Sequence, residues 1–137
     1  MNIYKKNGFA TIEAMLAVSI LVLFFLAFAG AIIFNKQNQE SLSNRGTATT
    51  LSEEAIEAIK NIRGAGFEKL LDGEYGLVEE DGKWKLISSF EMIDRFTRKV
   101  SIISIDNRRK KVVSKVSWQE YGNVKDVILT TYLTNWK

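Results

Sequence analysis

One uncharged stretch, from Ala14 to Phe34, constrains this 137-residue chain more than any other. Ser19 is the only polar side chain within it. At a rise of about 1.5 Å per residue, a helix over this stretch spans roughly 31 Å, close to the ~30 Å hydrocarbon core of a bilayer. A helix that is apolar on every side does not suit the surface of a soluble domain. We therefore expect a single transmembrane helix here.

An acidic residue, Glu13, stands directly before the apolar stretch. A carboxylate carried to the centre of a bilayer costs about 2.5–3.5 kcal/mol, so acids in such places usually serve a function and have a partner. Lys5 and Lys6 lie on the same side of the stretch. By the positive-inside rule, the N-terminus is expected in the cytoplasm and the C-terminal part outside.

The segment Lys5-Lys6-Asn7-Gly8-Phe9-Ala10-Thr11-Ile12-Glu13, with the apolar stretch after it, resembles a class III signal peptide. This is the N-terminus of type IV prepilins and of the pseudopilins of type II secretion. The resemblance implies that a prepilin peptidase cleaves between Gly8 and Phe9 and then N-methylates Phe9. It makes Lys5 and Lys6 the basic residues of the leader. Glu13 becomes the fifth residue of the mature chain, where the family keeps a glutamate.

Cleavage would place a positive amine on Phe9, beside the apolar helix. Pairing this amine with Glu13 of a neighbouring subunit offsets both charges and fixes the axial register between subunits. The chain departs from the family pattern in the order Ala10-Thr11-Ile12 and in having no proline. Gly30 lies in the part of the anchor where many pilins have a proline, which leaves open whether the helix melts there in a filament.

Two other readings of the N-terminus remain open. Ala27-Phe28-Ala29 fits the cleavage pattern of an ordinary secretory signal peptide. However, the apolar stretch continues to Phe34, and it is longer than the apolar region of such signal peptides, which usually has 7–15 residues. Glu13 also fits that reading poorly. A plain uncleaved anchor would keep Met1.

The composition removes several classes of chemistry. The chain has no cysteine and no histidine. Disulfides, Ser-His and Cys-His nucleophiles and the commonest zinc sites are therefore excluded. We expect neither an enzyme nor a cofactor or metal. The net charge is +3, and loss of Lys5 and Lys6 would leave 17 basic against 16 acidic side chains, so no general attraction to nucleic acid is indicated.

After the apolar stretch, residues 35–63 continue as an amphipathic helix. Leu42, Leu51, Ala55, Ile59 and Ile62 recur at helical spacing and are expected on one face. Gly46 and the threonine-rich stretch 47–50 predict a bend, and Gly64-Ala65-Gly66 ends the helix. One helix is therefore expected from near Phe9 to about Arg63.

The remaining residues predict a small antiparallel sheet. Residues 67–71 suggest a short helical turn or loop, and residues 75–79 and 83–87 form a hairpin around Glu80-Asp81-Gly82. Three longer strands are expected at 95–105, 110–120 and 124–136, with turns at Asp106-Asn107 and Gly122-Asn123. The second places Val112, Val116 and Trp118 on one face, and the last is apolar on both faces, which predicts burial of both.

These elements define an α+β fold, a long N-terminal helix packed on an antiparallel sheet. The expected parts are a cleaved leader (1–8), a transmembrane and assembly half of the helix (9–35), an amphipathic half (36–63) and a sheet head (64–137).

Two groups of charges are candidate binding sites. Asp72, Glu79, Glu80 and Asp81 lack the ligand spacing of a calcium loop, and a solvated turn is the better interpretation. The other group, Arg108-Arg109-Lys110-Lys111 with Lys115 nearby, is either a DNA-binding patch or a turn that keeps a sheet edge soluble. No aromatic residue is interleaved in it, so DNA binding is the less favoured interpretation.

The sequence thus predicts a minor type IV pilin or pseudopilin in the cytoplasmic membrane, with its head outside, that enters a pilus or pseudopilus. Its partners would be the prepilin peptidase, other pilin subunits, an inner-membrane assembly platform and lipid, and nucleic acid is not favoured. The main alternative is a membrane-anchored extracellular binding module that does not polymerise. A secreted enzyme is a weaker third. The sequence leaves open which machine is served and whether the subunit is major or minor, although the small head without a disulfide favours minor.

Overall fold

The computed structural model describes residues 7–135, with side chains from residue 10 onward. Its contacts divide the chain into two compact units, Met1–Glu40 and Ser41–Lys137. Within the described residues, the first contributes only helix, and the second contains the rest of that helix and the whole sheet.

Helix α1 runs from Asn7 to Ala65 without interruption, which confirms the expectation of one long helix. The predicted bend near Gly46 is wrong, because the helix is continuous there. The hydroxyls of Thr47, Thr49 and Thr50 each donate to the carbonyl four residues earlier, so these side chains lie against the helix instead of competing with it. The helix ends at the predicted glycines, where the Gly66 N–H donates to the Arg63 carbonyl at 3.0 Å.

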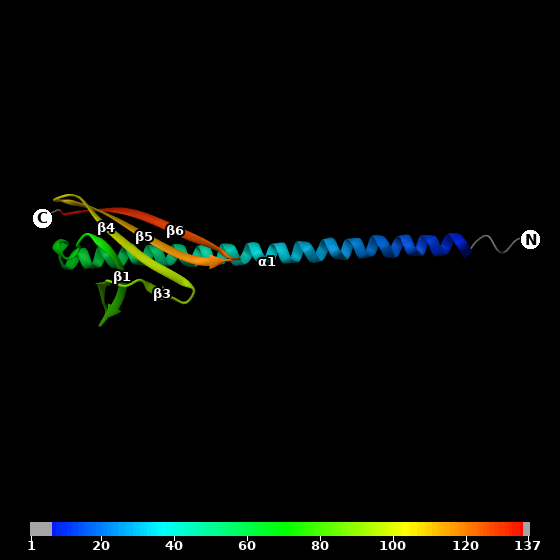
Figure 1. The fold of residues 1–137 in the computed structure, drawn as a ribbon, viewed down its shortest axis with the longest axis horizontal. Helices are drawn as coiled ribbons and strands as arrows, with labels where there is room; N and C mark the ends of the chain where they lie inside the picture. Colours follow the sequence, from blue (N-terminus) through cyan, green and yellow to red (C-terminus); the bar gives the residue numbers. More distant parts are fainter. Residues whose placement is uncertain (1–6, 136–137) are drawn as a thin grey trace, which may run out of the picture. The chain divides into compact units, whose positions relative to one another are not determined.

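A short 3-10 helix, η1 (Phe67–Lys69), leads into an antiparallel sheet of six strands (Figure 1). The strands are β1 (Gly73–Glu80), β2 (Lys83–Ile87), β3 (Glu91–Ile93), β4 (Phe96–Asp106), β5 (Arg109–Glu120) and β6 (Asn123–Thr134). Their order is β2-β1-β4-β5-β6, and β3 pairs with β4 next to β1. The α+β class expected from the sequence is therefore confirmed.

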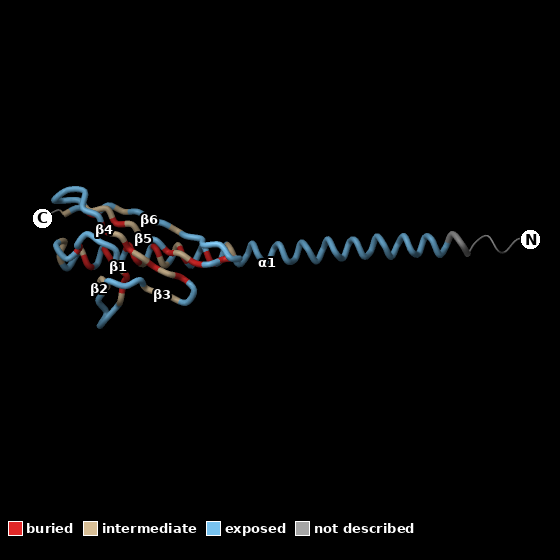
Figure 2. The backbone as a smooth tube through the Cα atoms, in the orientation of Figure 1, coloured by how far each residue is buried: buried red, intermediate tan, exposed pale blue. Residues whose placement is uncertain are grey.

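The second half of α1 lies along one face of this sheet, and the core is between them (Figures 1 and 2). From the helix come Ala48, Ala55, Ile59 and Ile62, which are buried. They face alternate residues of the central strands, which are Val100, Ile102, Val112, Val116 and Trp118. Strand periodicity accounts for this pattern, because alternate side chains point to opposite faces.

Leu42 was wrongly assigned to the buried helix face, since its side chain is 72% exposed. Nine residues separate it from Leu51, and at about 100° per residue this places the two on opposite sides of the helix. Two of the three buried helix positions at this end are polar, on either side of Ala48. Asn44 and Ser52 face the sheet, where Ser52 Oγ donates to Ser114 Oγ at 2.9 Å.

Two hairpin turns need left-handed backbone. Asp81 and Gly82 have φ values of 53° and 70°, and Tyr121 and Gly122 have 48° and 78°. Turns with two positive φ values match the right-handed twist of the strands that they join. The first hairpin is as predicted, whereas the second turn lies one residue earlier than the predicted Gly122-Asn123. The turn after β4 lies one residue later than the predicted Asp106-Asn107, at Asn107-Arg108.

Strand β6 is not buried on both faces in this chain. Its inward face carries the buried Leu133, with Val127 and Leu129 partly buried. Its outward face exposes Val124, Ile128 and Tyr132. Trp136, predicted to continue this face, lies outside the described residues.

Candidate functional site: the exposed segment of α1 and the basic turn

The first unit contains an exposed apolar helix that begins at a carboxylate. Every side chain from Ala10 to Glu40 is exposed, as the tube in Figure 2 shows. Glu13 lies one position before the uncharged residues 14–34, within the first two turns of α1. Ser19, the only polar residue of the stretch, donates its hydroxyl to the Met15 carbonyl at 2.7 Å. Its hydrogen bond is thus satisfied inside the helix, as a lipid environment requires.

This segment is long and apolar enough to cross a membrane. Such a continuous exposed apolar surface is far larger than the patches that soluble proteins tolerate. It therefore needs lipid or other apolar helices around it. The helix is compatible with a single-pass membrane anchor.

The residues of the predicted cleavage and methylation site are only partly described. Gly8 and Phe9 belong to α1 by their backbone, but the Phe9 side chain lies outside the described part. Lys5 and Lys6 also lie outside the described residues. The predicted pairing of the Phe9 amine with Glu13 of a neighbour involves two subunits and stays a prediction.

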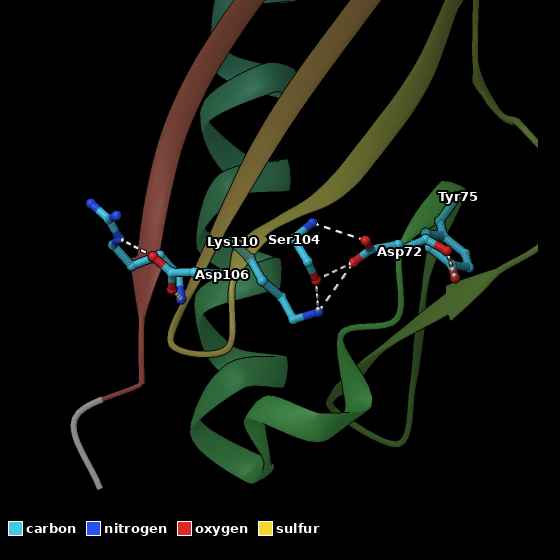
Figure 3. Close-up of polar contacts among 6 residues, drawn as sticks. Asp72, Tyr75, Ser104, Asp106 and Lys110 are labelled. Carbon is cyan, nitrogen blue, oxygen red and sulfur yellow. Dashed lines mark hydrogen bonds and ion pairs between the residues drawn. The ribbon is translucent and has the colours of Figure 1, made fainter.

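The basic turn between β4 and β5 is the other predicted site, and its cations are largely paired. Lys110 donates to Asp72 Oδ1 at 3.2 Å and to Ser104 Oγ at 2.8 Å (Figure 3). Ser104 in turn donates to Asp72 through both its hydroxyl, at 2.6 Å, and its backbone N–H, at 3.0 Å. Lys110 also lies over the Phe67 ring, and its side chain is only 13% exposed. This lysine holds strand ends together and presents little charge to solvent.

The neighbouring arginine is paired within the turn. Asp106 accepts from the Arg109 guanidinium at 2.7 Å and from the backbone N–H groups of Arg108 and Arg109. Lys115 pairs with Asp126 at 2.9 Å. Lys111 points to the sheet face opposite Lys110, because neighbouring strand residues alternate. Arg109, Lys111 and Lys115 therefore share the outward face of β5, where Arg109 and Lys115 are in ion pairs. That DNA binding is the less favoured interpretation stays a prediction.

Hydrogen bonds favour the ionised form of two carboxyl groups at this end of the sheet, Asp72 before β1 and Asp106 at the end of β4. The side chain and backbone of Ser104 lower the pKa of Asp72, with a smaller contribution from Lys110. The backbone N–H of Arg108, followed by the Arg109 side chain, lowers the pKa of Asp106. Both carboxylates act as hydrogen-bond acceptors that join neighbouring parts of the fold.

The acidic residues of the candidate calcium loop have separate partners. Asp72 serves Ser104 and Lys110, whereas Glu80 pairs with Lys85 at 2.5 Å, and this pairing lowers the pKa of Glu80. Among the described residues, no group of three or more potential ligands is placed to hold a metal ion.

Sequence reasoning missed two buried charges in the head. Arg98 on β4 and Glu120 at the end of β5 are both buried. Each occupies an inward position of the strand alternation, Arg98 between Phe96 and Val100, and Glu120 two residues after Trp118. The alternation was the available signal, because it assigns these positions to the core whatever residue stands there.

Comparison with models of known families, with curated proteins and with solved structures finds no match for this chain.

Proposed function

We propose that this chain is a minor type IV pilin or pseudopilin, a structural subunit that a prepilin peptidase processes and that assembles into a pilus or pseudopilus. Its role is not catalytic. The precursor is anchored in the cytoplasmic membrane with its head outside, and the mature subunit then leaves the membrane for the filament. Assembly would depend on other pilin subunits and on an inner-membrane platform.

One observation carries this proposal. A single helix combines an N-terminal glutamate, an uncharged exposed stretch and a buried face that packs on a sheet. In a membrane the stretch can be covered by lipid, and in a filament it can be covered by the same stretch of other subunits. Glu13 is the only ionisable side chain from Ala10 to Phe34, so it is the natural partner for a new amine at Phe9.

The alternative is a membrane-anchored binding module that never polymerises. It needs the apolar stretch but gives Glu13 no task. Replacement of Glu13 therefore separates the two proposals.

Glu13→Ala is expected to leave insertion and cleavage intact, since these depend on the leader and Gly8, and to deplete the subunit from filaments. Removing one partner of a buried pair typically costs about 3–5 kcal/mol, because the other charge is left unpaired. The measurement is the ratio of this subunit in sheared filaments to that in the membrane fraction.

Glu53→Ala is the matched control, because Glu53 is an exposed carboxylate on α1 outside the apolar stretch. It should enter filaments at the wild-type ratio. If Glu13→Ala does the same, the pairing mechanism is wrong for this subunit. Recovery of neither the wild type nor the control in filaments would favour the anchored module.

A further inference from the structure

Strand β2 (Lys83–Ile87) is an open edge of the sheet. It pairs with β1 on one side, and no other described strand pairs with it. In an antiparallel ladder, alternate N–H and C=O groups of an edge strand point away from the sheet. The outward-pointing main-chain groups of β2 are therefore available to another extended chain.

A groove of about 780 Å³ runs along this edge, between β2 and the last turn of α1. Ile62 and Ala65 of the helix and Trp84 and Leu86 of the strand give it apolar walls. Its volume lies in the range of ordinary ligand sites. The Arg98 guanidinium lies 5.8 Å from the centre of the Trp84 ring. This contact from the core side helps to hold the Trp84 side chain in place.

The charges at the groove have one sign. Lys69, Lys83 and Lys85 line it, and no carboxylate does. Lys85 pairs with Glu80, whereas Lys69 and Lys83 are exposed and have no ion pair among the described residues. The groove therefore presents two free cations beside an apolar wall.

Positively charged and apolar side chains alternate along β2. Lys83 and Lys85 are exposed, whereas Trp84 and Leu86 are partly buried against the core. Cross-strand neighbours share a face of the sheet, so a strand added at this edge would meet lysines on one face and Trp84 and Leu86 on the other. A complementary strand alternates acidic and apolar residues.

We propose that this groove binds an extended segment of a partner polypeptide, about five residues long with alternating acidic and apolar side chains, which adds to β2 as a further strand. Main-chain hydrogen bonds to β2 give affinity. The acidic side chains lie beside Lys83 and Lys69, and the apolar ones cover Trp84, Leu86 and Ile62. This site does not depend on cleavage of the precursor or on filament assembly.

The test uses the full-length chain in detergent micelles and the peptide Glu-Val-Glu-Val-Glu-amide with fluorescein on its N-terminal amine, and fluorescence anisotropy is the readout. Saturable binding is expected. The combined change Lys69→Glu and Lys83→Glu should weaken it by about tenfold, through two reversed charges. Both lysines are exposed, so the fold should be retained, which an unchanged thermal midpoint would verify. Lys125→Glu on β6, at the other edge of the sheet, should change binding by less than about twofold.

Three further probes separate the mode of binding. The peptide Glu-Glu-Glu-Val-Val has the same composition without alternation, and a version with alternate N-methylated amides cannot form a ladder; both should bind at least about tenfold more weakly. A labelled DNA duplex is the third probe and should not compete. Equal binding of the N-methylated peptide, or competition by duplex that is lost in the lysine variant, would overturn the proposal in favour of a general polyanion site. Failure of the alternating peptide to saturate would also overturn it.

Discussion

At the residue scale, Arg98 is the most constrained side chain of the head. It is 1% exposed, and its Nε and Nη2 donate to the same oxygen of Glu91 at 2.9 and 2.7 Å. Nη1 donates to the Leu51 carbonyl of α1 at 3.2 Å and lies 3.5 Å from Glu54. One cation thus joins the central strand β4 to β3 and to the helix. A buried charge is tolerated only when it is paired in this way.

Glu91→Ala should destabilise the head by about 3 kcal/mol, because it leaves the buried guanidinium without its closest partner. Denaturant unfolding of the full chain in detergent, followed by tryptophan fluorescence, measures this. Glu57→Ala removes the exposed pair with Lys60 at 2.6 Å and should cost less than about 0.5 kcal/mol. Equal effects of the two variants would contradict the role given to Arg98.

Glu120 makes the stability of the head depend on pH in the acidic range. Its carboxylate accepts from Asn44 Nδ2 and from Ser41 Oγ, each at 3.1 Å, and the Asn44 amide is the main cause of its lowered pKa. A lowered pKa adds stability above the ordinary value of 4.5, and this stability is lost as the pH falls through the folded pKa.

The thermal midpoint of the wild type should therefore fall more steeply below about pH 4.5 than that of Glu120→Gln, which cannot titrate. Asn44→Ala should flatten the acid limb in the same direction, because it removes the main donor. Parallel curves for the wild type and both variants, from pH 7 down to about pH 3, would show that this carboxyl contributes nothing to acid unfolding.

At the scale of elements, two glycines test whether backbone conformation decides the effect of a side chain. Gly46 in α1 and Gly82 in the β1–β2 turn both leave open space for a Cβ atom. Gly46→Ala should stabilise the chain by about 0.5–1 kcal/mol through helix propensity. Gly82→Ala should destabilise it by about 1 kcal/mol, since φ is +70° there. Denaturant unfolding checks both, and effects of the same sign would contradict the account.

The elements that the sequence predicted well are those with strong local signals. The helix, the Asp81-Gly82 hairpin and the three long strands all follow from periodicity or turn chemistry. The buried residues Val112, Val116 and Trp118 follow from alternation once the strand is assigned. In these cases local preference and tertiary packing agree.

The parts that were missed depend on contacts between distant residues. β3 is only three residues long, and its pairing with β4 includes Glu91, which binds Arg98. Hydrophobicity alone could not place Arg98, Glu120 or Asn44 in the interior, because each is tolerated there only through a partner elsewhere in the fold. The bend expected at Gly46 is absent, because the residues around it remain helical and the face of the helix that they share is packed against the sheet.

At the scale of the whole molecule, α1 serves two environments. Residues 41–65 bury one face against the sheet, whereas residues 10–40 are exposed on all sides. The second unit has its own core and sheet, whereas the first has no buried residue from Ala10 to Glu40. The first unit therefore requires lipid or neighbouring helices. Under the proposed function, processing of its N-terminal residues distinguishes a subunit that leaves the membrane from a permanent anchor.

The N-terminus of the mature chain tests this account most directly. The full-length protein should be co-expressed with a prepilin peptidase, purified from membranes and analysed by intact mass and N-terminal peptide mapping. The account predicts loss of residues 1–8 and a single methyl group on Phe9, with the processing blocked by a residue larger than alanine at Gly8. A chain that begins near Gly30, or that still carries Met1 beside an active peptidase, would contradict it.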